Sequence, residues 1–259
     1  MRNNMYDVET YIADIYDQIE TGTKDVILLK KLIKNNKYKI LEPFCGTGRI
    51  SIPLALDEHV VTGLDKAKGM LDWFKLKIVK LNINDKVELI CQDVIQEQWP
   101  VGFDLVLLAC NCFYELATPV EQESCIKKAA KSLKAGGYLY VDNDHMEGDL
   151  AKNWQDTGIT HRSICGTAQD GSIIESTRKL ISFNVKKRIC KFERYCKVVK
   201  PNKEVIECSY IQQKHPVSTA EVQGWLLKNG FRIINHYGNY NCEPYQHKLP
   251  RSIFWAVKI

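Results

Sequence analysis

The chain has 259 residues, of which 45% are hydrophobic and 26% charged, and this composition excludes a collagen, a coiled coil or a disordered protein. Its length predicts one or two domains, and the formal charge of only +5 is too small to indicate nucleic-acid binding by itself. The ten cysteines include no Cys-x-x-Cys pair, and Cys110-x-Cys112 is the tightest spacing. A zinc framework needs matched pairs, so we expect no metal site and reduced thiols that mostly fill the core.

The beginning of the chain, MRNNMYDVETYIADIYDQ, is acidic and lacks the apolar segment of a signal peptide. No apolar run elsewhere approaches the 18 residues that a membrane span requires. We therefore expect a cytoplasmic protein that has no membrane partner.

Helices and strands alternate along the first half of the chain. Apolar residues at helical spacing predict one helix from Val8 to Ile19 and another, after Gly22, from Val26 to Ile33. Apolar runs predict five strands, which are residues 38–42, 60–65, 87–93, 103–110 and 137–142. Between these strands, helices are predicted at residues 50–55, at residues 70–78, and from the capping box at Thr118 to Gly136-Gly137. Apolar strands separated by helices indicate a parallel sheet that is buried on both faces.

The pattern changes after residue 150, where four strands and no helix are predicted between Ile159 and Gln212. In the third of these strands apolar residues alternate with charged ones; the apolar set is Cys190, Phe192, Cys196 and Val198. This alternation predicts an antiparallel strand with one buried face. A second capping box, at Ser218, begins a helix that ends at Gly230, and FRIINHY and SIFWAVKI predict two final strands.

The most informative segment is the loop EPFCGTGR, residues 42–49, between the first strand and its helix. Gly46 and Gly48 allow a sharp turn and the close approach of a ligand to a helix N-terminus. The dinucleotide fingerprint G-x-G-x-x-G is the competing interpretation, but Ser51 occupies its third glycine position. Glu42 would also repel a pyrophosphate, whereas it suits a cation such as the ammonium group of an amino acid.

Two more carboxylates end neighbouring strands. Asp65 follows the second strand, where it is placed to accept hydrogen bonds from two ribose hydroxyls. Asp93 follows the third strand, where it can accept from the exocyclic amine of adenine; a simple turn residue is the alternative. A ligand with an amino-acid head, a ribose and an adenine is S-adenosylmethionine.

Six segments resemble, in order, the motifs of class I (Rossmann-like) S-adenosylmethionine-dependent methyltransferases of the small-molecule type. They are ILEPFCGTGRISIPLA, VVTGLD, CQDV, FDLVLLACNCFYEL, LKAGGYLYVD and STAEVQGWLLKNGFRI. The resemblance implies an α/β fold with helices on both faces of a mostly parallel seven-stranded sheet, in the order 3-2-1-4-5-7-6 with the last strand antiparallel. It divides the chain into an N-terminal helical segment over the active site (1–37), a methyltransferase core (38–149 and 218–259) and an antiparallel β lid inserted after strand five (150–217).

The resemblance also implies S-adenosylmethionine as cofactor and S-adenosylhomocysteine as product. Glu42, Gly46 and Gly48 would hold the methionine moiety, and Asp65 the ribose. The other residues expected to contact the cofactor are Tyr11, Tyr16, Phe44, Thr47, Arg49, Lys66, Met70, Asp93, Val94, Ala109 and Asn111. Packing by the two tyrosines, and satisfaction of a loop backbone by Asn111, are the structural alternatives. Cys110 and Cys112 are expected to pack on one face of the fourth strand.

Methyl transfer from a sulfonium is an in-line displacement, so alignment in a dry site provides most of the rate. An amine needs a proton acceptor only after attack, whereas a hydroxyl needs a base during it. The predicted catalytic residues are His145, which follows the fifth strand, and Tyr114, while Asp142 is a further candidate base. An exposed loop histidine is the alternative for His145.

The expected function is methyl transfer to a nitrogen or oxygen of a small molecule. Residues 150–217 contain 13 Lys and Arg against 6 Asp and Glu, which favours an anionic acceptor, although a solvated strand face explains the same charge. The first alternative is an RNA or protein methyltransferase. Base-modifying enzymes have an Asn/Asp-Pro-Pro-aromatic loop where this chain has Asn111-Cys112-Phe113-Tyr114, so no nucleic-acid partner is expected. The second alternative is a regulatory protein that binds S-adenosylmethionine without catalysis, and the sequence leaves the oligomeric state open.

Overall fold

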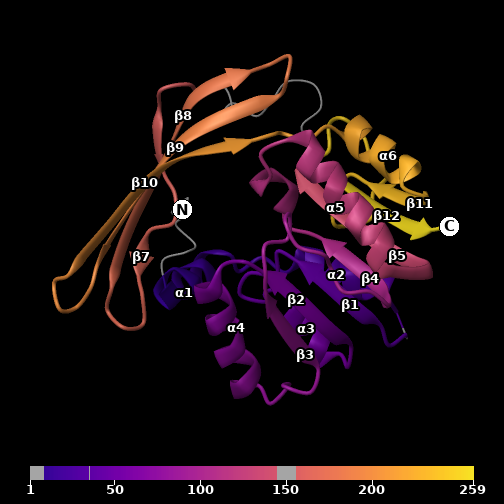
Figure 1. Cartoon of the computed structure of the whole chain (residues 1–259), viewed down its shortest axis with the longest axis horizontal. Helices are drawn as coiled ribbons and strands as arrows, with labels where there is room; N and C mark the ends of the chain where they lie inside the picture. The colour runs from indigo at the N-terminus through magenta and orange to yellow at the C-terminus, as the bar shows by residue number, and fades with distance from the viewer. Residues whose placement is uncertain (1–8, 35, 145–155) are drawn as a thin grey trace.

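A seven-stranded sheet forms the centre of the molecule in the computed structural model, which describes residues 9–34, 36–144 and 156–259 (Figure 1). Its strands are β1 (Lys39–Pro43), β2 (Val60–Asp65), β3 (Val87–Cys91), β4 (Phe103–Leu108), β5 (Leu133–Asp144), β11 (Phe231–Tyr237) and β12 (Arg251–Lys258). They are ordered β3-β2-β1-β4-β5-β12-β11. β1 to β5 pair in parallel, whereas β12 runs antiparallel to both β5 and β11. This confirms the predicted order and the antiparallel last strand.

Helices cover both faces of this sheet because successive strand residues enter opposite apolar layers. Ile40 and Leu105 join the layer under α2 (Lys24–Leu32), α3 (Ser51–Leu56) and α4 (Lys68–Lys80). Their neighbours Leu41 and Val106 join the layer under α5 (Pro119–Ser132) and α6 (Thr219–Lys228). All four side chains are fully buried. Within the described ranges, no helix combines the length and the apolar character needed to cross a bilayer.

The capping signals that were read from the sequence act where expected. Thr118 and Ser218 each accept a hydrogen bond from the backbone N–H of a glutamate three residues later, and the carboxylate of that glutamate accepts one from the backbone N–H of the capping residue. α5, however, ends at Ser132 and not at Gly136-Gly137, so this boundary was predicted wrongly. Leu133 is already extended and buried, because it pairs with Phe103 of β4.

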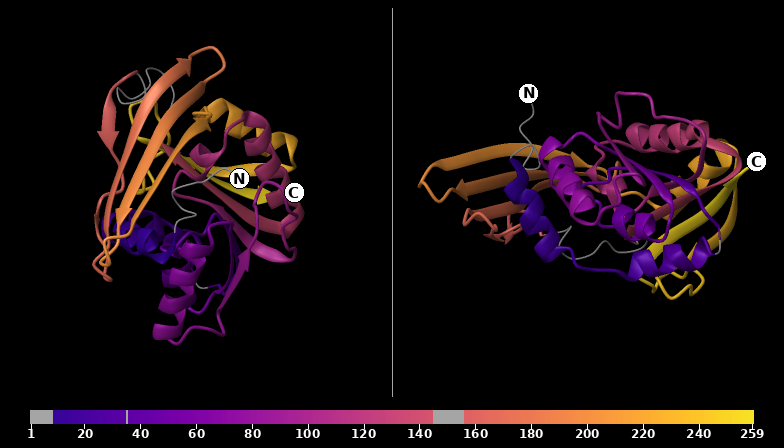
Figure 2. Two further views of the ribbon diagram at one scale, coloured as in Figure 1. Left: turned by 60° about the vertical axis from the view of Figure 1, so that its left-hand side comes forward. Right: turned by 90° about the horizontal axis from the view of Figure 1, so that it is seen from below.

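A second, antiparallel sheet lies between β5 and α6 in the chain, as the fold prediction required. This second sheet comprises β6 (Thr160–Arg162), β7 (Gly166–Thr167), β8 (Ile173–Asn184), β9 (Ile189–Val199) and β10 (Val205–Lys214). The order is β10-β9-β8-β6, with β7 also paired to β8. Five strands are present where four were expected, because the first part is divided into two very short pieces. Figure 2 shows the second sheet projecting to one side of the main sheet.

Helix α1 (Glu9–Ile19) joins the two sheets. Its Ile12 and Ile15 are buried against Ile174 and Val198 of the second sheet. Its opposite side packs on α4, where Ala13 contacts Met70. The helix that the apolar spacing predicted at the start of the chain is therefore a bridge, buried on two sides.

Candidate active site

A cavity of about 400 Å³ lies at the carboxyl ends of β1 to β4. Its walls come from the loops that follow these four strands and, on the far side, from residues 210–213 of β10. β1 and β4 are adjacent although β2 and β3 separate them in the chain, so the cavity sits at the switch point where open α/β sheets bind ligands. Its volume is within the usual range for a small-molecule site, about 300–1,000 Å³.

The loop after β1 forms the floor through left-handed backbone conformations. Phe44, Gly46 and Gly48 have φ angles of 64°, 53° and 81°. A side chain at Gly48 would place its Cβ only 2.3 Å from the Phe74 ring of α4. Position 48 therefore needs glycine for two separate reasons, its backbone angle and its contact with α4.

We expect Gly48→Ala to lower the free energy of unfolding by about 2–4 kcal/mol, the sum of a left-handed alanine and an overpacked contact. Gly102→Ala is the matched control, since Gly102 has a φ of 91° but nothing within 4 Å of its absent Cβ. Urea unfolding of both variants measures the difference. Equal losses in the two variants would contradict the proposed clash with Phe74.

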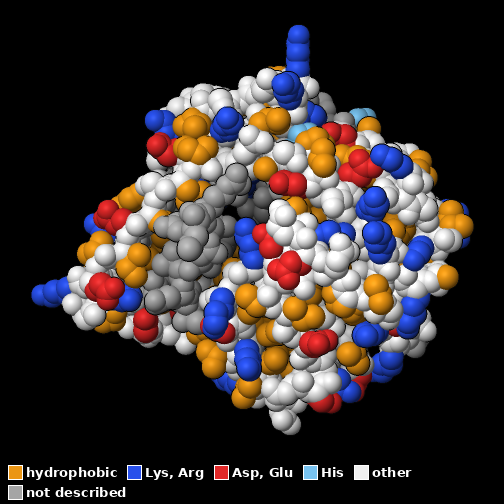
Figure 3. All heavy atoms as spheres, in the orientation of Figure 1, with side chains coloured by type: hydrophobic (Ala, Val, Ile, Leu, Met, Phe, Trp, Pro, Cys, Tyr) orange, Lys and Arg blue, Asp and Glu red, His pale blue; other side chains and the backbone are white. Residues whose placement is uncertain are grey.

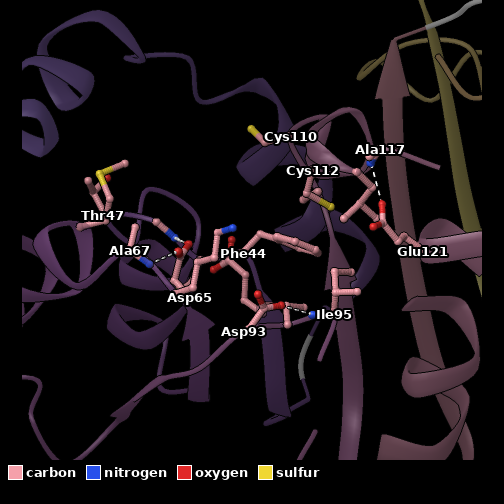
Figure 4. A pocket seen from close by; sticks show the side chains of 18 of the residues that line it. Phe44, Thr47, Asp65, Ala67, Asp93, Ile95, Cys110, Cys112, Ala117 and Glu121 are labelled. Atoms are coloured by element: carbon pink, nitrogen blue, oxygen red, sulfur yellow. Dashed lines mark hydrogen bonds between the residues drawn. The ribbon is translucent and has the colours of Figure 1, made fainter. Parts of the chain in front are cut away.

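Asp65 connects the loops after β1 and β2. Its two carboxylate oxygens accept backbone hydrogen bonds from Gly46 and Ala67, each 2.9 Å long (Figure 4). Burial raises the pKa of Asp65, although these donors oppose the shift. Each oxygen keeps a second lone pair, and Asp65 lines the cavity, so the carboxylate can accept further hydrogen bonds from a ligand.

Glu42 is a buried carboxylate in the same cavity, only 5% exposed. Ser51 Oγ donates a hydrogen bond to its Oε2, and no cationic side chain forms an ion pair with it in the described part of the chain. Burial raises the pKa of Glu42 to about 7, against the opposing effects of Ser51 and Arg49. A cation bound beside Glu42 would favour its ionised form and so drive off the proton.

This coupling predicts a pH-dependent affinity. The Kd for S-adenosylmethionine should fall as pH rises from about 5.5 to 7, because Glu42 ionises, and should rise again near pH 8, where an α-amino group loses its proton. Glu42→Gln should remove the lower limb and retain the upper one, as measured by calorimetric titration across this range. A lower limb that persists in Glu42→Gln would contradict the role of this carboxylate.

The ionisation of Glu42 that favours cofactor binding at higher pH is expected to lower the stability of the free protein. The folded pKa of Glu42 lies above the unfolded value, so wild type loses stability relative to Glu42→Gln as pH rises from about 4.5 to 7. Thermal unfolding at pH 5 and pH 8 should therefore show the variant gaining over wild type at the higher pH.

Arg49 is held at the edge of the loop by Asp25 of α2. Its guanidinium donates to both oxygens of Asp25, to the carbonyl of Gly22 and to Cys110 Sγ. Burial raises the pKa of Asp25, but the hydrogen bonds and charge of Arg49 outweigh it, and the pKa is lowered overall. Arg49 lines the cavity, but most of its N–H groups donate to these neighbouring residues and so stabilise the cavity wall.

Helix α1 is fastened over this site by two aspartates. Asp17 accepts hydrogen bonds from Thr47 Oγ1 (2.5 Å), Trp73 Nε1 (2.8 Å) and Lys77 Nζ (2.5 Å), so it links α1 to the β1 loop and to α4. Asp14 accepts from the backbone of Gln169 (2.6 Å), in the turn between β7 and β8 of the second sheet. These contacts place Tyr16 in the cavity wall.

Asp93 and Asn111 organise the backbone of their loops. Asp93 Oδ1 accepts from the amides of Ile95 (2.8 Å) and Gln96 (3.2 Å), which is the turn predicted as its alternative role, although Asp93 also lines the cavity. Asn111 exchanges two hydrogen bonds with Asp144, of 2.6 and 2.9 Å, and so ties the end of β4 to the end of β5. It does not line the cavity.

The structure therefore brings most of the predicted cofactor residues together. Those lining the cavity are Tyr16, Glu42, Phe44, Gly46, Thr47, Arg49, Asp65, Lys66, Met70, Asp93, Val94 and Ala109. Gly48 lies behind the wall, against Phe74. His145 lies outside the described residues, as do the side chains of Tyr11 and Tyr114. The roles given to all these residues stay predictions.

The sequence patterns did not predict some of the residues that line the cavity. Cys110 lies beyond the end of β4, with a φ of 54°, and it is exposed to the cavity, so its predicted packing on a strand face is wrong. Cys112 is buried as expected, but in a short 3₁₀ helix, Cys112–Glu115. Residues 210–213 reach the cavity from a strand about 100 residues further along the chain, which no local pattern reveals.

Asp142, the further candidate base, is committed to other partners. It is fully buried and accepts hydrogen bonds from Arg251 Nε (3.0 Å) and Tyr240 OH (2.9 Å). Burial raises the pKa of Asp142, and Arg251 opposes this shift. In the described part of the chain, no cluster of three His, Cys, Asp or Glu side chains is arranged to hold a metal ion.

Comparisons with known proteins agree with this geometry. A family model described as a methyltransferase domain matches residues 34–189. A chain from Geobacillus sp. (strain WCH70), whose name assigns it provisionally to the methyltransferases, is 23% identical over 236 residues, which is 89% of this chain and 88% of that one.

Two solved structures share the fold. The CcbJ methyltransferase of Streptomyces caelestis aligns with a TM-score of 0.73 at 18% identity, over 97% of this chain and 99% of that one. SAM-bound CalS10 of Micromonospora echinaspora, an amino pentose methyltransferase, aligns with a TM-score of 0.63 at 16% identity over the whole of both chains. These matches agree with the dependence on S-adenosylmethionine that is expected from the sequence. The chain belongs to the methyltransferase domain family.

Proposed function

We propose that this enzyme transfers a methyl group from S-adenosylmethionine to a nitrogen or oxygen atom of a small molecule. The observation that carries the proposal is the presence of two carboxylates, the buried Glu42 and the half-buried Asp65, in one cavity at the switch point of the sheet. The first suits a cation and the second suits paired hydroxyl groups. Glu42, at the mouth of the glycine loop, would repel a dinucleotide pyrophosphate.

The donors and acceptors of the cavity fit this cofactor end to end. Glu42 would accept from the ammonium group, Asp65 from the two ribose hydroxyls, and Asp93 from the adenine amine. Phe44, Met70 and Val94 supply the apolar surface of a planar base. When bound, S-adenosylmethionine supplies an electrophilic methyl group on a cationic sulfur.

The chain contributes alignment and the exclusion of water. Helix α1 is fixed over the β1 loop through Asp17, and residues 210–213 of β10 close the far side of the cavity. Gln213 Nε2 donates to the carbonyl of Ala117 (3.0 Å), which joins the second sheet to the loop after β4. A methyl acceptor held between these walls meets the methyl group from one direction only, as an in-line displacement requires.

An amine is the better-supported acceptor. No histidine lines the cavity within the described ranges, and its carboxylates sit in the part assigned to the cofactor except Glu121, which accepts hydrogen bonds from the backbone N–H groups of Ala117 and Thr118. An amine attacks in its neutral form and releases a proton afterwards, so it needs no base beside it in the transition state. The structural likeness to CalS10, named as an amino pentose methyltransferase, points the same way.

The direct experiment incubates the purified chain with S-adenosylmethionine and a panel of small amines and alcohols, and follows S-adenosylhomocysteine release and product mass. Turnover of amines supports the proposal. Tight cofactor binding without turnover of any acceptor would support the non-catalytic alternative. Strong, salt-sensitive binding to RNA would support the other alternative; Lys and Arg are scattered over the face in Figure 3, which does not favour it.

A further inference from the structure

The two faces of the second sheet carry different charge patterns. On the outer face, cross-strand neighbours have opposite charges. Glu175 of β8 stands opposite Lys197 of β9, Lys179 stands opposite Glu193, and Lys197 Nζ lies 3.6 Å from Glu207 of β10. Opposite charges at directly facing positions stabilise a sheet, so the outer face follows the ordinary rule.

The inner face breaks this rule at its centre. Arg178 of β8 stands directly opposite Arg194 of β9. The same row continues to His161 of β6 beyond Arg178 and to Tyr210 of β10 beyond Arg194. Directly opposed like charges destabilise a sheet. The inner face therefore holds a cationic row that pairing across the strands does not explain.

Apolar residues enclose the arginine pair on both sides. Toward one end of the strands lie Ile174 and Cys196, which pack on helix α1. Toward the other end lie Leu180 and Phe192. Arg194 is only 8% exposed, although it occupies the apolar side of the alternation seen in the sequence. A solvated strand face, the competing explanation for the basic charge of this segment, does not fit a guanidinium buried to this extent.

Neither arginine has an anionic partner among the described residues. Arg194 Nε donates to Gln212 Oε1 (3.0 Å), but no carboxylate lies within ion-pair distance of Arg178 or Arg194. Burial and the charge of Arg194 lower the pKa of Arg178. In the same row, His161 Nε2 has no hydrogen-bond partner, and its nearest carboxylate oxygen is Asp156 Oδ2 at 3.9 Å. Arg178 is half-buried and Arg194 is buried, and a buried charge without a partner is costly unless a ligand satisfies it.

The row lies beside the cavity. Tyr210 and Gln212, which line the cavity, are the residues that contact or face Arg194. Glu42 and Asp65, the carboxylates assigned to the cofactor, occupy the opposite wall, at the ends of β1 and β2. Neither arginine lines the cavity itself. Arg194 stands next to Tyr210, and Arg178 is one strand further away, so an acceptor reaches the pair with the part of it that extends past Tyr210 and Gln212.

We propose that Arg178 and Arg194 form a subsite for an oxyanion, a carboxylate or a phosphate, carried by the methyl acceptor. The proposal rests on the proposed function and names its substrate class. Guanidinium groups present parallel N–H donors that match the oxygens of either anion, and two opposed guanidiniums are neutralised when an anion lies between them.

The test uses the chain saturated with S-adenosylhomocysteine, and inorganic phosphate and acetate as separate probes at constant ionic strength. Melting temperature is followed as each probe replaces sodium chloride. We expect a saturable rise with at least one probe, and the stronger probe identifies the anion. Arg178→Gln and Arg194→Gln should each weaken that binding about ten- to hundredfold. Lys179→Gln, on the outer face, should leave it unchanged.

Arg178→Glu separates binding from folding. It places a glutamate opposite Arg194, so the sheet should become more stable while anion binding is lost. Binding that survives both glutamine substitutions, or the absence of a saturable effect with either probe, would overturn the subsite. If S-adenosylhomocysteine itself fails to stabilise the wild-type chain, it is the proposed function that fails.

Discussion

Replacing Asp65 by asparagine is expected to raise the Kd for S-adenosylmethionine about hundredfold. Asp65 is proposed to accept from two ribose hydroxyls, and a hydrogen bond to a charged group contributes about 1.5–3 kcal/mol. An asparagine amide cannot replace the carboxylate. Both oxygens of the Asp65 carboxylate already accept hydrogen bonds from backbone N–H groups, those of Gly46 and Ala67. The asparagine NH₂ would therefore face one of these donors.

The matched control is Asp72→Asn, the same change on the surface of α4, where the half-exposed Asp72 pairs with Lys68. Calorimetric titration of both variants, with thermal unfolding to verify the fold, measures the effect. A hundredfold loss in Asp65→Asn alone supports the ribose contact. An unchanged Kd in a folded Asp65→Asn protein would remove Asp65 from the cofactor site.

The largest expected loss of stability follows from Arg49→Met. Arg49 and Asp25 form a two-pronged ion pair in which the side chains are 16% and 5% exposed. Removing the guanidinium leaves the Asp25 carboxylate buried without its counter-charge, which costs about 3–5 kcal/mol. Urea unfolding measures this loss. Cofactor affinity should fall as well, because the same pair braces the loop that carries Gly46 and Gly48.

Two controls show whether the buried charge is the cause. Asp25→Asn combined with Arg49→Met should recover most of the lost stability, because no unpaired charge remains. Lys30→Met removes a cation from another α2 ion pair, with Asp57, but both partners are exposed, so the cost should stay within about 1 kcal/mol. If the double variant is as unstable as Arg49→Met, the buried-charge explanation is wrong.

The main sheet could be predicted from the sequence because its signals are local. Apolar strands such as FDLVLL alternate with helices, two of which begin at capping boxes, and the structure has the same elements in the same order. The error at the end of α5 shows the limit of such signals. Gly136-Gly137 has the composition of a helix end, but Leu133 gains more by pairing with Phe103 and becoming buried.

In the candidate site, too, the residues with local signals could be predicted and the contacts between distant segments could not. Glu42, Gly46 and Asp65 stand at strand ends, so the sequence alone placed them at one edge of the sheet, and the cavity contains all three. The bracing pairs Arg49–Asp25 and Asn111–Asp144 join distant segments, and no spacing announces them. The same holds for the wall from β10.

Helix α1 was predicted from its apolar spacing, but the contacts that fasten it were not. Its tyrosines are predicted to cover the cofactor, and Tyr16 lines the cavity, whereas the fastening hydrogen bonds come from Asp14 and Asp17. Likewise, Arg194 occupies a position of the apolar alternation in β9, and only the register with Arg178 shows why an arginine there is unusual.

The most direct test of the central claim is a crystal structure of the chain with S-adenosylmethionine bound. The account predicts the ligand in the cavity at the carboxyl ends of β1 to β4, with Glu42 within about 2.7–3.2 Å of its amino group. Both ribose hydroxyls should lie at the same distance from Asp65. A ligand bound elsewhere, or bound in the cavity without touching either carboxylate, would contradict the account.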